Sequence, residues 1–413
     1  MSSSPTTNSS PLNVLIVGAG IGGLTASVAL RRNGHSVRIF EAAEIKTEAG
    51  AAITVQENSM RVHDYIGVSR ENFRGVPWAG AEIICSDGSQ GDSFKWLVPG
   101  MVSNGLLCHR SDMHQELMRL AVGLDGQGPP AKLHLGAKVV DCNTEEGTIT
   151  LDGGEIVRGD CILGADGIYS VIRNHVLGSV VNPQDSGLSC FRIVLETATV
   201  HDVPELEWLH GIESGIARSI VSKNGPLRML YIYPCRNGTL VNIVGIHVDS
   251  PTHLSGTSVT TLEEFKTTYA DFHPTFLRIL DLPVHNPIHK YKLRVLPTLA
   301  GWVSGRAAIL GDAAHATLPL LGQGAGSAVE EAVTLGCFLP SGTLPEDVPA
   351  RLRAYEEHCK PRGDFISAES VVQAEKGFSF YTSEELQIKL LAYDPVEAAS
   401  EFFASRLARR CKY

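Results

Sequence analysis

The chain has 413 residues, of which 43% are hydrophobic and 19% charged, and its formal net charge at pH 7 is −10. This length is enough for two domains or for one large α/β unit with an inserted region, and the composition is ordinary for a globular protein. The acidic balance argues against a nucleic-acid partner, because proteins that bind nucleic acids present a basic face to the phosphates.

Residues 1–11 are rich in Ser, Thr and Pro and have no apolar centre, so we expect a disordered leader rather than a signal peptide. No run of about 18 apolar residues follows anywhere in the chain, which predicts a protein without a membrane span. The nine cysteines include no Cys-x-x-Cys pair, which favours reduced thiols and a cytoplasmic location.

The most informative stretch, residues 14–41, begins with an apolar strand that leads into Gly18, Gly20 and Gly23. Gly18 allows a tight turn, Gly20 lets the backbone approach a pyrophosphate, and Gly23 lets the following helix pack closely on the strand. The pyrophosphate would lie at the helix N-terminus, where free N–H groups favour negative charge. A second strand ends at Glu41, within reach of a ribose. This pattern predicts a dinucleotide site and by itself leaves NAD and FAD open, although the glutamate and the position near the chain start favour FAD.

Short helices and strands are expected between this motif and residue 164. A helix is expected near residues 61–66, and Ser111 is the expected N-cap of a helix over 111–121. Strands, with turn signals such as Asp87-Gly88 after some of them, are expected at residues 81–86, 93–97, 132–141, 148–152 and 161–164.

The character of the sequence changes near Gly187. Four β-rich segments follow, separated by Gly, Pro and Asn turns and by no helix-period pattern, at residues 190–196, 216–222, 227–233 and 240–248. This arrangement predicts an antiparallel sheet rather than βαβ units. Beyond it we expect a buried strand over 306–310 and helices over 262–279, 323–339, 349–374 and most of the tail.

The expected fold is therefore α/β, with a Rossmann-like dinucleotide-binding domain in discontinuous segments and an inserted, mainly antiparallel β-sheet domain for the substrate. The first domain would comprise residues 12–75, 101–182 and 286–340. The inserted domain would comprise 76–100 and 183–285, and a helical segment over 341–413 would close the chain.

Two later segments carry chemistry. In residues 161–173, a buried strand runs into a tight turn at Asp166-Gly167, which would orient Arg173 unless that residue is a surface arginine. In residues 306–331, a buried strand delivers Asp312 at its C-terminal edge, where α/β folds bind ligands. An acid there can accept hydrogen bonds from a polyol such as the FAD ribityl chain, or it can cap a helix.

A glycine-rich loop follows Asp312. Pro319, Gly322, Gly324 and Gly326 would form a thin-walled turn against which a flat ring can lie. The helix that begins over 323–325 would direct its positive end at a flavin and stabilise negative charge on the reduced ring.

Together, the fingerprint at 14–41, the Asp166-Gly167 turn and the segment 306–331 resemble the single-component, FAD-dependent aromatic hydroxylases of the para-hydroxybenzoate hydroxylase fold, and within them the salicylate hydroxylase-like branch. The resemblance covers nearly the whole chain from Leu12, with the motifs in the family's order. It implies non-covalently bound FAD, with NAD(P)H as a transient co-substrate that has no Rossmann domain of its own. It also implies a monooxygenase in which O2 adds to reduced flavin to give a C4a-hydroperoxide, whose distal oxygen is transferred to a phenolic or other electron-rich aromatic ring.

The resemblance also implies roles for individual residues. Arg110 matches the family arginine that approaches the FAD phosphates or the flavin, although a surface ion pair would also explain it. Asp166 and Gly167 would help hold FAD and touch NAD(P)H. The complete set of expected cofactor contacts is Gly18, Gly20, Gly23, Glu41, Ala52, Arg110, Asp166, Gly167, Asp312, Pro319, Gly322, Gly324 and Ala325.

The expected catalytic and substrate contacts are Arg192, Tyr231 and Tyr233. Arg192 interrupts an apolar strand and could pair with a phenolate or carboxylate, unless it lies at an edge exposed to water. Tyr231 and Tyr233 alternate to one face, and the pair Tyr233-Pro234 resembles the Tyr-Pro of salicylate hydroxylase-like relatives. Packing within the sheet explains the two tyrosines equally well.

Other chemistries have less support. His285 and His289 have helical metal-ligand spacing, but Pro287 lies between them, so no metal site is expected. His315 could line the flavin pocket or be a hydrogen-bonded structural histidine. A flavin-dependent oxidase or reductase on the same fold that inserts no oxygen, and a non-catalytic flavin-binding protein, are the alternatives. The expected partners are a small aromatic substrate, O2 and NAD(P)H, and the protein would be a monomer or homodimer; the substrate and the choice of NADH or NADPH stay open.

Overall fold

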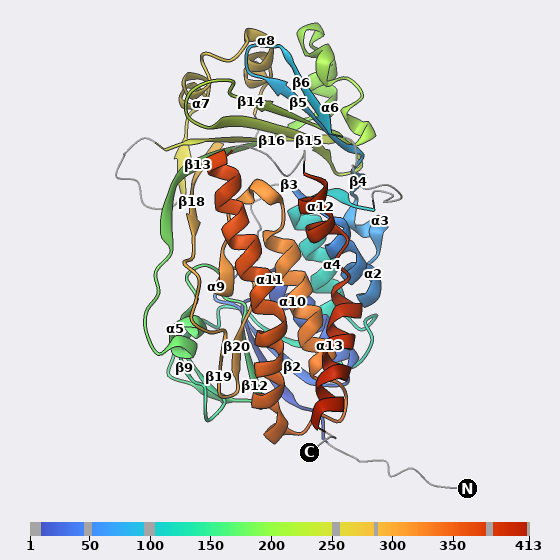
Figure 1. The fold of residues 1–413 in the computed structure, drawn as a ribbon, viewed down its shortest axis with the longest axis vertical. Helices are drawn as coiled ribbons and strands as arrows, with labels where there is room; N and C mark the ends of the chain where they lie inside the picture. The colour runs from blue at the N-terminus through green and yellow to red at the C-terminus, as the bar shows by residue number, and fades with distance from the viewer. Residues whose placement is uncertain are drawn as a thin grey trace, which may run out of the picture.

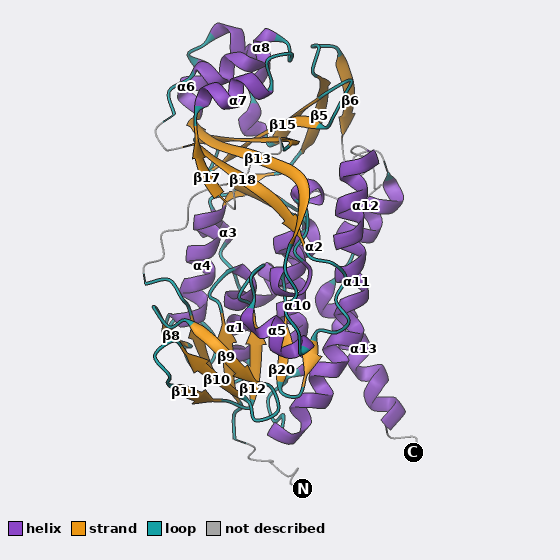
Figure 2. Ribbon diagram, turned by 90° about the vertical axis from the view of Figure 1, so that its left-hand side faces the viewer, coloured by secondary structure: helices purple, strands orange, loops and turns teal. Residues whose placement is uncertain are grey.

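The computed structural model describes residues 10–44, 52–94, 104–249, 257–284, 288–376 and 383–410. The expected leader at 1–11 therefore lies almost wholly outside the described residues. Figures 1 and 2 show one sheet at the lower end of the molecule, a larger curved sheet at the upper end, and long helices that run alongside.

The lower sheet has six strands in the order β19-β20-β12-β1-β2-β8, and neighbours pair in parallel except β19 and β20. Its central strand β1 (Asn13–Val17) is buried from Val14 to Val17, as expected for a strand covered on both faces. The other strands are β2 (Ser36–Phe40), β8 (Lys132–His134), β12 (Cys161–Gly164), β19 (Val303–Ser304) and β20 (Ala307–Ile309). This parallel sheet confirms the predicted α/β class.

Two helices pack together beside this sheet through small residues. They are α1 (Ile21–Arg32) and α10 (Gly324–Phe338). A Cβ on Gly336 would lie 2.8 Å from the Cβ of Ala29, and a Cβ on Gly22 would lie 3.2 Å from that of Ala328. The remaining helices of this part are α2 (Glu57–Ile66), α3 (Arg70–Phe73), α4 (Arg110–Val122), α5 (Val171–Leu177), α9 (Asp312–His315), α11 (Val348–Lys376), α12 (Glu384–Leu391) and α13 (Pro395–Arg410).

Two small three-stranded sheets are also present among the described residues. One has the order β3-β7-β4, from β3 (Ala52–Val55), β7 (Leu106–His109) and β4 (Val76–Pro77). The other is formed by β9 (Val139–Asn143), β10 (Thr148–Leu151) and β11 (Ile156–Arg158). The segment expected as one strand over 132–141 is thus divided between β8 and β9, with Gly136 in the left-handed region at φ +64° between them.

The upper sheet has eight strands in the order β17-β18-β13-β16-β15-β14-β5-β6. All neighbours pair antiparallel except β14 and β5, which are parallel, so the sheet is mainly antiparallel as predicted. Its strands are β5 (Gly80–Cys85), β6 (Gln90–Phe94), β13 (Gln184–Glu196), β14 (Ile216–Val221), β15 (Arg228–Cys235), β16 (Leu240–Val248), β17 (Thr257–Thr260) and β18 (Ile288–Val295).

The two faces of this sheet belong to different cores, because side chains alternate along each strand. On the outer face, Phe191 and Ile193 pack with Phe265 of α7 (Leu262–Thr268). On the inner face, Cys190 and Val244 belong to the core that also contains residues of β3, α12 and the loop at 318–321. The inner face is therefore the one directed at the dinucleotide-binding part of the chain.

Two details of the upper part differ from expectation. Residues 288–295 were expected in the first domain, but β18 pairs with β13 and so belongs to the large sheet. Short helices, α6 (Thr197–His201), η1 (Pro204–Leu209) and η2 (Ile212–Ser214), occupy the connection between β13 and β14 where no helix was expected.

Two expected helices also differ. The segment 262–279 is divided into α7, α8 (Pro274–Leu277) and the 3-10 turn η3 (Arg278–Asp281), because Pro274 cannot continue a helix from the preceding turn and instead begins a new one. Helix α4 begins at Arg110 with His109 as its N-cap, so Ser111 is not the cap. The Ser111 hydroxyl lies 2.6 Å from Nδ1 of His109 instead.

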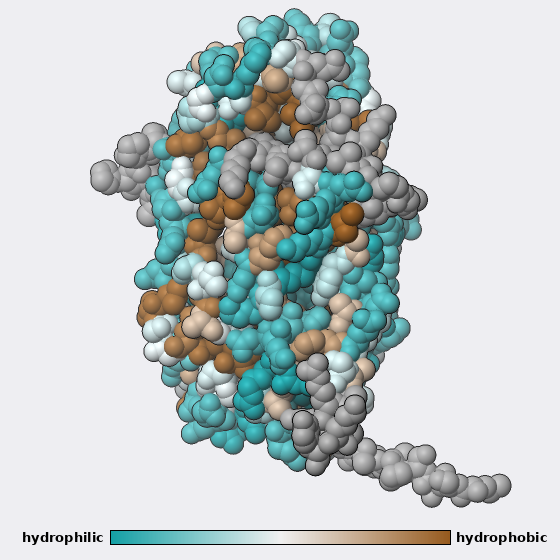
Figure 3. All heavy atoms as spheres, viewed as in Figure 1, coloured by the Kyte–Doolittle hydropathy of each residue, from teal (hydrophilic) through white to brown (hydrophobic). Residues whose placement is uncertain are grey.

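Hydrophilic side chains dominate much of the surface over α11 and α13 in the view of Figure 3. Among the described residues, no helix combines the length and the hydrophobicity needed to cross a bilayer.

Candidate functional site

The glycine turn between β1 and α1 separates into two structural glycines and one that leaves space. Gly18 has φ +97°, and a Cβ there would lie 2.3 Å from the carbonyl oxygen of Ala165. A Cβ on Gly23 would lie 2.1 Å from the oxygen of Gly18, so the helix could not approach this closely. A Cβ on Gly20 would meet nothing within 4 Å, and no side chain caps α1, which begins after Gly20. The first amides of α1 therefore face open space of the kind that a pyrophosphate fills.

Glu41, at the end of β2, lies beside this turn. Its Oε2 accepts a hydrogen bond from the N–H of Ala19 at 2.8 Å, and its Oε1 accepts one from Ala43 at 3.1 Å. His114 holds the same turn from α4, because its Nε2 lies 2.8 Å from the oxygen of Ala19. The carboxylate thus stands next to the predicted pyrophosphate position, half-exposed to solvent.

Asp166 has a local structural task that the sequence did not reveal. Its carboxylate accepts hydrogen bonds from the backbone N–H groups of Val171 (2.7 Å) and Ile172 (3.1 Å) at the start of α5, and from the hydroxyl of Ser170. Burial raises its pKa, although these hydrogen bonds lower it. Asp166 therefore holds the turn that packs against Gly18, where a Cβ would lie 3.1 Å from the Asp166 Cα.

Arg173 is not a surface arginine. It is 1% exposed, and its guanidinium donates hydrogen bonds to the backbone oxygens of Ile168 and Val181 at 2.9 Å and of Ala313 at 3.3 Å. It therefore ties the Asp166-Gly167 turn to the start of α9, which joins two of the three sequence motifs.

A buried ion pair supports the turn at Asp312. Glu331 accepts a hydrogen bond from the N–H of Gly311 at 2.7 Å and contacts Nε2 of His315 at 2.5 Å. Burial lowers the pKa of His315, but the charge and hydrogen bond of Glu331, together with the charge of Asp312, outweigh it, so the pKa of His315 is raised. Of the two interpretations left open for His315, this contact supports the structural one.

Asp312 itself remains open to solvent at the C-terminal edge of β20. The protein atoms around it desolvate the carboxylate and raise its pKa, while the charges of His315 and Arg110 lower it. Asp312 and Arg110, which comes from the N-terminus of α4, are thus close enough to interact electrostatically. A polyol bound between them would meet an acceptor and a cation.

The loop after Asp312 has the thin wall that was predicted. Pro319 begins a 3-10 turn, η4 (Pro319–Leu321), and Gly322 follows at φ +63°. Gly322, Gly324 and Ala325 are partly exposed, although most of the residues after them in α10 are buried. No side chain caps α10, so its first amides can face a ligand.

A polar network holds this loop from behind. Gln56 donates to the oxygen of Leu321 at 3.0 Å, and Asn58 donates to Oε1 of Gln323 at 2.8 Å and to Glu330 at 2.6 Å. All of these side chains are buried, and no pattern in the sequence indicates that they are in contact.

Ala52 connects the two parts of the chain at the site. Its N–H donates to Oδ1 of Asn242, on the inner face of β16, at 3.2 Å. The predicted flavin contacts at Ala52 and at 319–325 thus lie against the inner face of the large sheet.

The three expected substrate residues all point to this inner face. In the strand register, Tyr231, Val244 and Arg192 lie directly opposite one another on β15, β16 and β13. Tyr233 is next to Tyr231, with ring centroids 5.0 Å apart, and is 4% exposed. Asn242, which contacts Ala52, is two residues from Val244, about 6.6 Å along the strand. The structure therefore brings Arg192 and both tyrosines close to the expected flavin contacts.

Sequence reasoning missed two neighbours of Arg192. His289 lies opposite Arg192 on β18, and the guanidinium carbon of Arg192 lies 5.5 Å from the ring centre of Tyr291. The signal that could have found them is the alternation of His289 and Tyr291, which places both side chains on one face of a strand. His285 lies outside the described residues.

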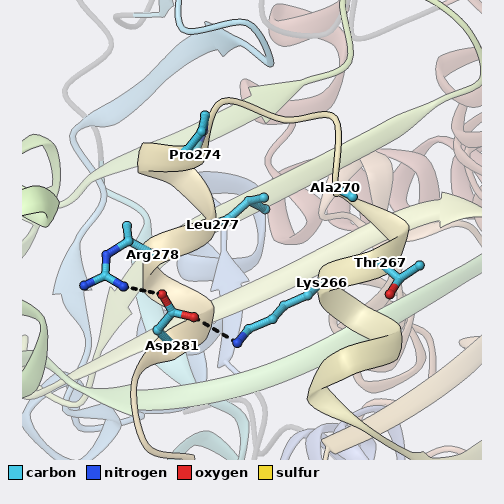
Figure 4. Close-up of a pocket in the computed structure, with 7 residues that line it drawn as sticks. All are labelled: Lys266, Thr267, Ala270, Pro274, Leu277, Arg278 and Asp281. Atoms are coloured by element: carbon cyan, nitrogen blue, oxygen red, sulfur yellow. Dashed lines mark hydrogen bonds and ion pairs between the residues drawn. The ribbon is translucent and has the colours of Figure 1, made fainter.

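A cavity elsewhere in the molecule does not belong to this site. This cavity, of about 400 Å³, is lined by residues of α7, α8 and η3. Figure 4 shows Asp281 there between Lys266 and Arg278. Asp281 pairs with Lys266 at 2.8 Å and with Arg278 at 2.5 Å. These helices cover the outer face of the large sheet, away from the predicted flavin contacts.

Within the described residues, no cluster of three or more His, Cys, Asp or Glu side chains could hold a metal ion.

A family model described as an FAD binding domain matches residues 11–370. The chain belongs to this FAD-binding family. Hispidin-3-hydroxylase from Neonothopanus nambi is 37% identical to this flavoprotein in an alignment that covers 96% of this chain and 97% of that protein.

Solved structures share the fold. A salicylate hydroxylase substrate complex superposes with a TM-score of 0.78 at 22% identity, covering 94% of this chain and 97% of that one. CtdE in complex with FAD and a substrate superposes with a TM-score of 0.81 at 20% identity, covering 97% and 100%. This flavoprotein is therefore a monooxygenase of the aromatic hydroxylase type, as its motifs predicted.

The residues present fit FAD. The open space at Gly20 and the uncapped start of α1 suit the pyrophosphate, and the half-exposed Glu41 stands beside them. Asp312 and Arg110 suit the ribityl and phosphate region, and the thin loop before α10 suits a flat ring. The individual contacts to FAD are a prediction that mutation can test.

Proposed function

We propose that this flavoprotein uses NAD(P)H and O2 to hydroxylate a phenolic or other electron-rich aromatic ring, and that hispidin is the first compound to test. The observation that carries the proposal is the position of Arg192, half-buried on the inner face of the large sheet and near the Asn242–Ala52 contact. The similarity to hispidin-3-hydroxylase over nearly the full length of both chains supports the choice of compound.

Bound FAD would supply the activation of O2. The chain's own task is to hold the ring in place and to keep water out. Arg192 would pair with an anionic oxygen of the substrate, and Tyr231 and Tyr233 would contact the ring with their faces and hydroxyls. The surrounding inner-face side chains, such as Val244 and Ile246, are apolar and would exclude water from the reacting ring.

The test is a panel of hispidin, salicylate and simple phenols, added to the purified flavin-bound protein with NADH or NADPH and air. The expected result is NAD(P)H oxidation stimulated by at least one of them, with a product that has gained one oxygen atom. Stimulation without that gain in mass would favour the oxidase or reductase alternative. A colourless protein that takes up no FAD would contradict every flavin-based function.

We also propose a cytoplasmic location and a monomeric or homodimeric state. The described cysteines are all free thiols, which supports a reducing compartment. Light scattering of the purified protein tests the assembly, and a mass above that of a dimer would contradict it.

A further inference from the structure

Arg192 and His289 form a pair on the inner face of the large sheet. They lie directly opposite each other on β13 and β18, a position that places the Cβ atoms of antiparallel neighbours about 5 Å apart. Both belong to the inner face, because residues two apart on a strand share a face. Arg192 is two residues from Cys190, and His289 is two residues from Tyr291 and four from Leu293, all of which are part of the inner-face core. The Tyr291 ring lies beside both: 5.5 Å from the guanidinium carbon of Arg192 and 6.0 Å from the ring centre of His289.

The pair has few polar partners. Within the described part of the chain, no carboxylate lies within 4 Å of Arg192, and its buried Nε has no hydrogen-bond partner. Its polar neighbour is the thiol of Cys190, whose pKa is raised by burial although Arg192 lowers it. Nδ1 of His289 is likewise buried without a partner among these residues, which leaves Nε2 as the ring nitrogen open to a ligand.

Two lysines of β18 are paired with a carboxylate. Lys290 and Lys292 alternate to the outer face, where Asp249 lies 3.3 Å and 3.2 Å from their Nζ atoms. Arg294 of β18 also has a buried Nε without a hydrogen-bond partner, but it follows the inner-face residue Leu293 and so is directed to the outer face. A half-buried guanidinium without a counter-ion is costly, so Arg192, which lies on the inner face near the expected flavin contacts, points to an anion supplied by a ligand. The groups that face His289 are Arg192 from β13, Tyr291 from its own strand and the apolar Val259 from β17.

We propose that His289 is the base that ionises the substrate and that Arg192 binds the resulting oxyanion. This inference rests on the proposed function and narrows it. The O–H bond of the substrate breaks, its electron pair stays on the oxygen, and the proton goes to Nε2 of His289, which becomes an imidazolium. The ring that carries the oxyanion is then more electron-rich and accepts an electrophilic oxygen more readily. The substrate class is therefore a ring with a weakly acidic hydroxyl, a phenol or an enol, because a carboxylic acid would arrive already ionised.

The test uses 4-nitrophenol, whose absorbance distinguishes phenol from phenolate, bound to the FAD-loaded protein and titrated with pH. We expect the wild-type protein to bind the probe as phenolate well below the pH at which it ionises in solution. The variant His289→Gln keeps a polar side chain of similar size but no base. In this variant, the acid dissociation constant of the bound probe should be at least about tenfold lower than in the wild type. Turnover of a phenolic substrate by the variant should fall about 100-fold at low pH and recover at high pH.

Two further variants sharpen the result. Arg192→Gln should weaken phenolate binding at every pH. His201→Gln is the matched control, because His201 lies on α6 and pairs with Glu213 at 3.0 Å, away from the inner face. It should leave the titration unchanged.

The inference is overturned if His289→Gln and the wild type give the same titration, or if the wild type binds the probe only as the neutral phenol or not at all. Failure of the proposed function is a separate result. In that case the wild-type protein would bind no FAD, or would add no oxygen to any compound of the panel.

Discussion

Two glycines of the fingerprint should respond differently to the same substitution. Gly23→Ala places a Cβ 2.1 Å from the backbone oxygen of Gly18, which cannot move without displacing the turn. Overpacking of this kind costs about 1–3 kcal/mol, and alanine returns about 1 kcal/mol through its higher helix propensity. Because the clash is with backbone, we expect a net loss near the upper end of this range, about 2 kcal/mol, in the protein freed of FAD.

Gly20→Ala places its Cβ where nothing lies within 4 Å, at an ordinary φ of −74°. The protein without FAD should therefore lose less than about 1 kcal/mol, the cost of a poorer helix cap. The new methyl group would occupy the space predicted for the pyrophosphate. FAD should then bind at least about tenfold more weakly, which corresponds to about 1.4 kcal/mol.

Urea unfolding of the FAD-free variants and fluorescence titration with FAD measure the two quantities separately. Gly153→Ala is the control, since its Cβ would also meet nothing within 4 Å, on a hairpin turn that no motif connects to the cofactor. The reasoning is refuted if Gly20→Ala destabilises the FAD-free protein as much as Gly23→Ala does, or if it leaves the affinity for FAD unchanged.

Three further outcomes are expected. Arg192→Ala should increase the NAD(P)H oxidised per product formed, with peroxide released; unchanged coupling and substrate affinity would make Arg192 structural. Arg236→Ala removes both hydrogen bonds of 2.9 Å to the buried Asp112 and should cost about 2 kcal/mol in urea unfolding; a change below about 0.5 kcal/mol would contradict a role in joining β15 to α4. The raised pKa of His315 means that its pairing with Glu331 stabilises the protein fully below about pH 6.5 and less as the pH rises through the folded-state pKa. Unfolding free energies of the wild type and His315→Gln should therefore differ more at pH 6 than at pH 9, and a difference that grows with pH would refute this.

Much of the fold followed from the sequence because its signals are local. The strand, turn and helix of 13–32 depend on residues that are neighbours along the chain, and Gly18 and Gly23 have the steric roles that their spacing predicted. The alternation of Tyr231 and Tyr233 likewise placed both side chains on one face of a strand before the partner strands were known.

The sequence was less informative where long-range contacts decide. The sequence predicts that Asp166 contacts the cofactor, but its carboxylate also accepts hydrogen bonds from two backbone N–H groups at the start of α5. Only the tertiary structure shows these two hydrogen bonds. The network of Gln56, Asn58 and Gln323 joins residues more than 260 positions apart, so no local pattern could reveal it.

By itself, then, the sequence determined the dinucleotide fingerprint and the mainly antiparallel insertion, because glycine spacing and strand alternation depend on residues that are close together in the chain. The kind of chemistry followed from the resemblance of three motifs to the aromatic hydroxylases. Only the tertiary structure decided which of those residues meet. Residues 288–295 could have belonged to either part of the chain, and their pairing with β13 depends on a register between segments about a hundred residues apart. That register places His289 opposite Arg192, because side chains across a sheet become neighbours only when the backbone hydrogen bonds between their strands have formed.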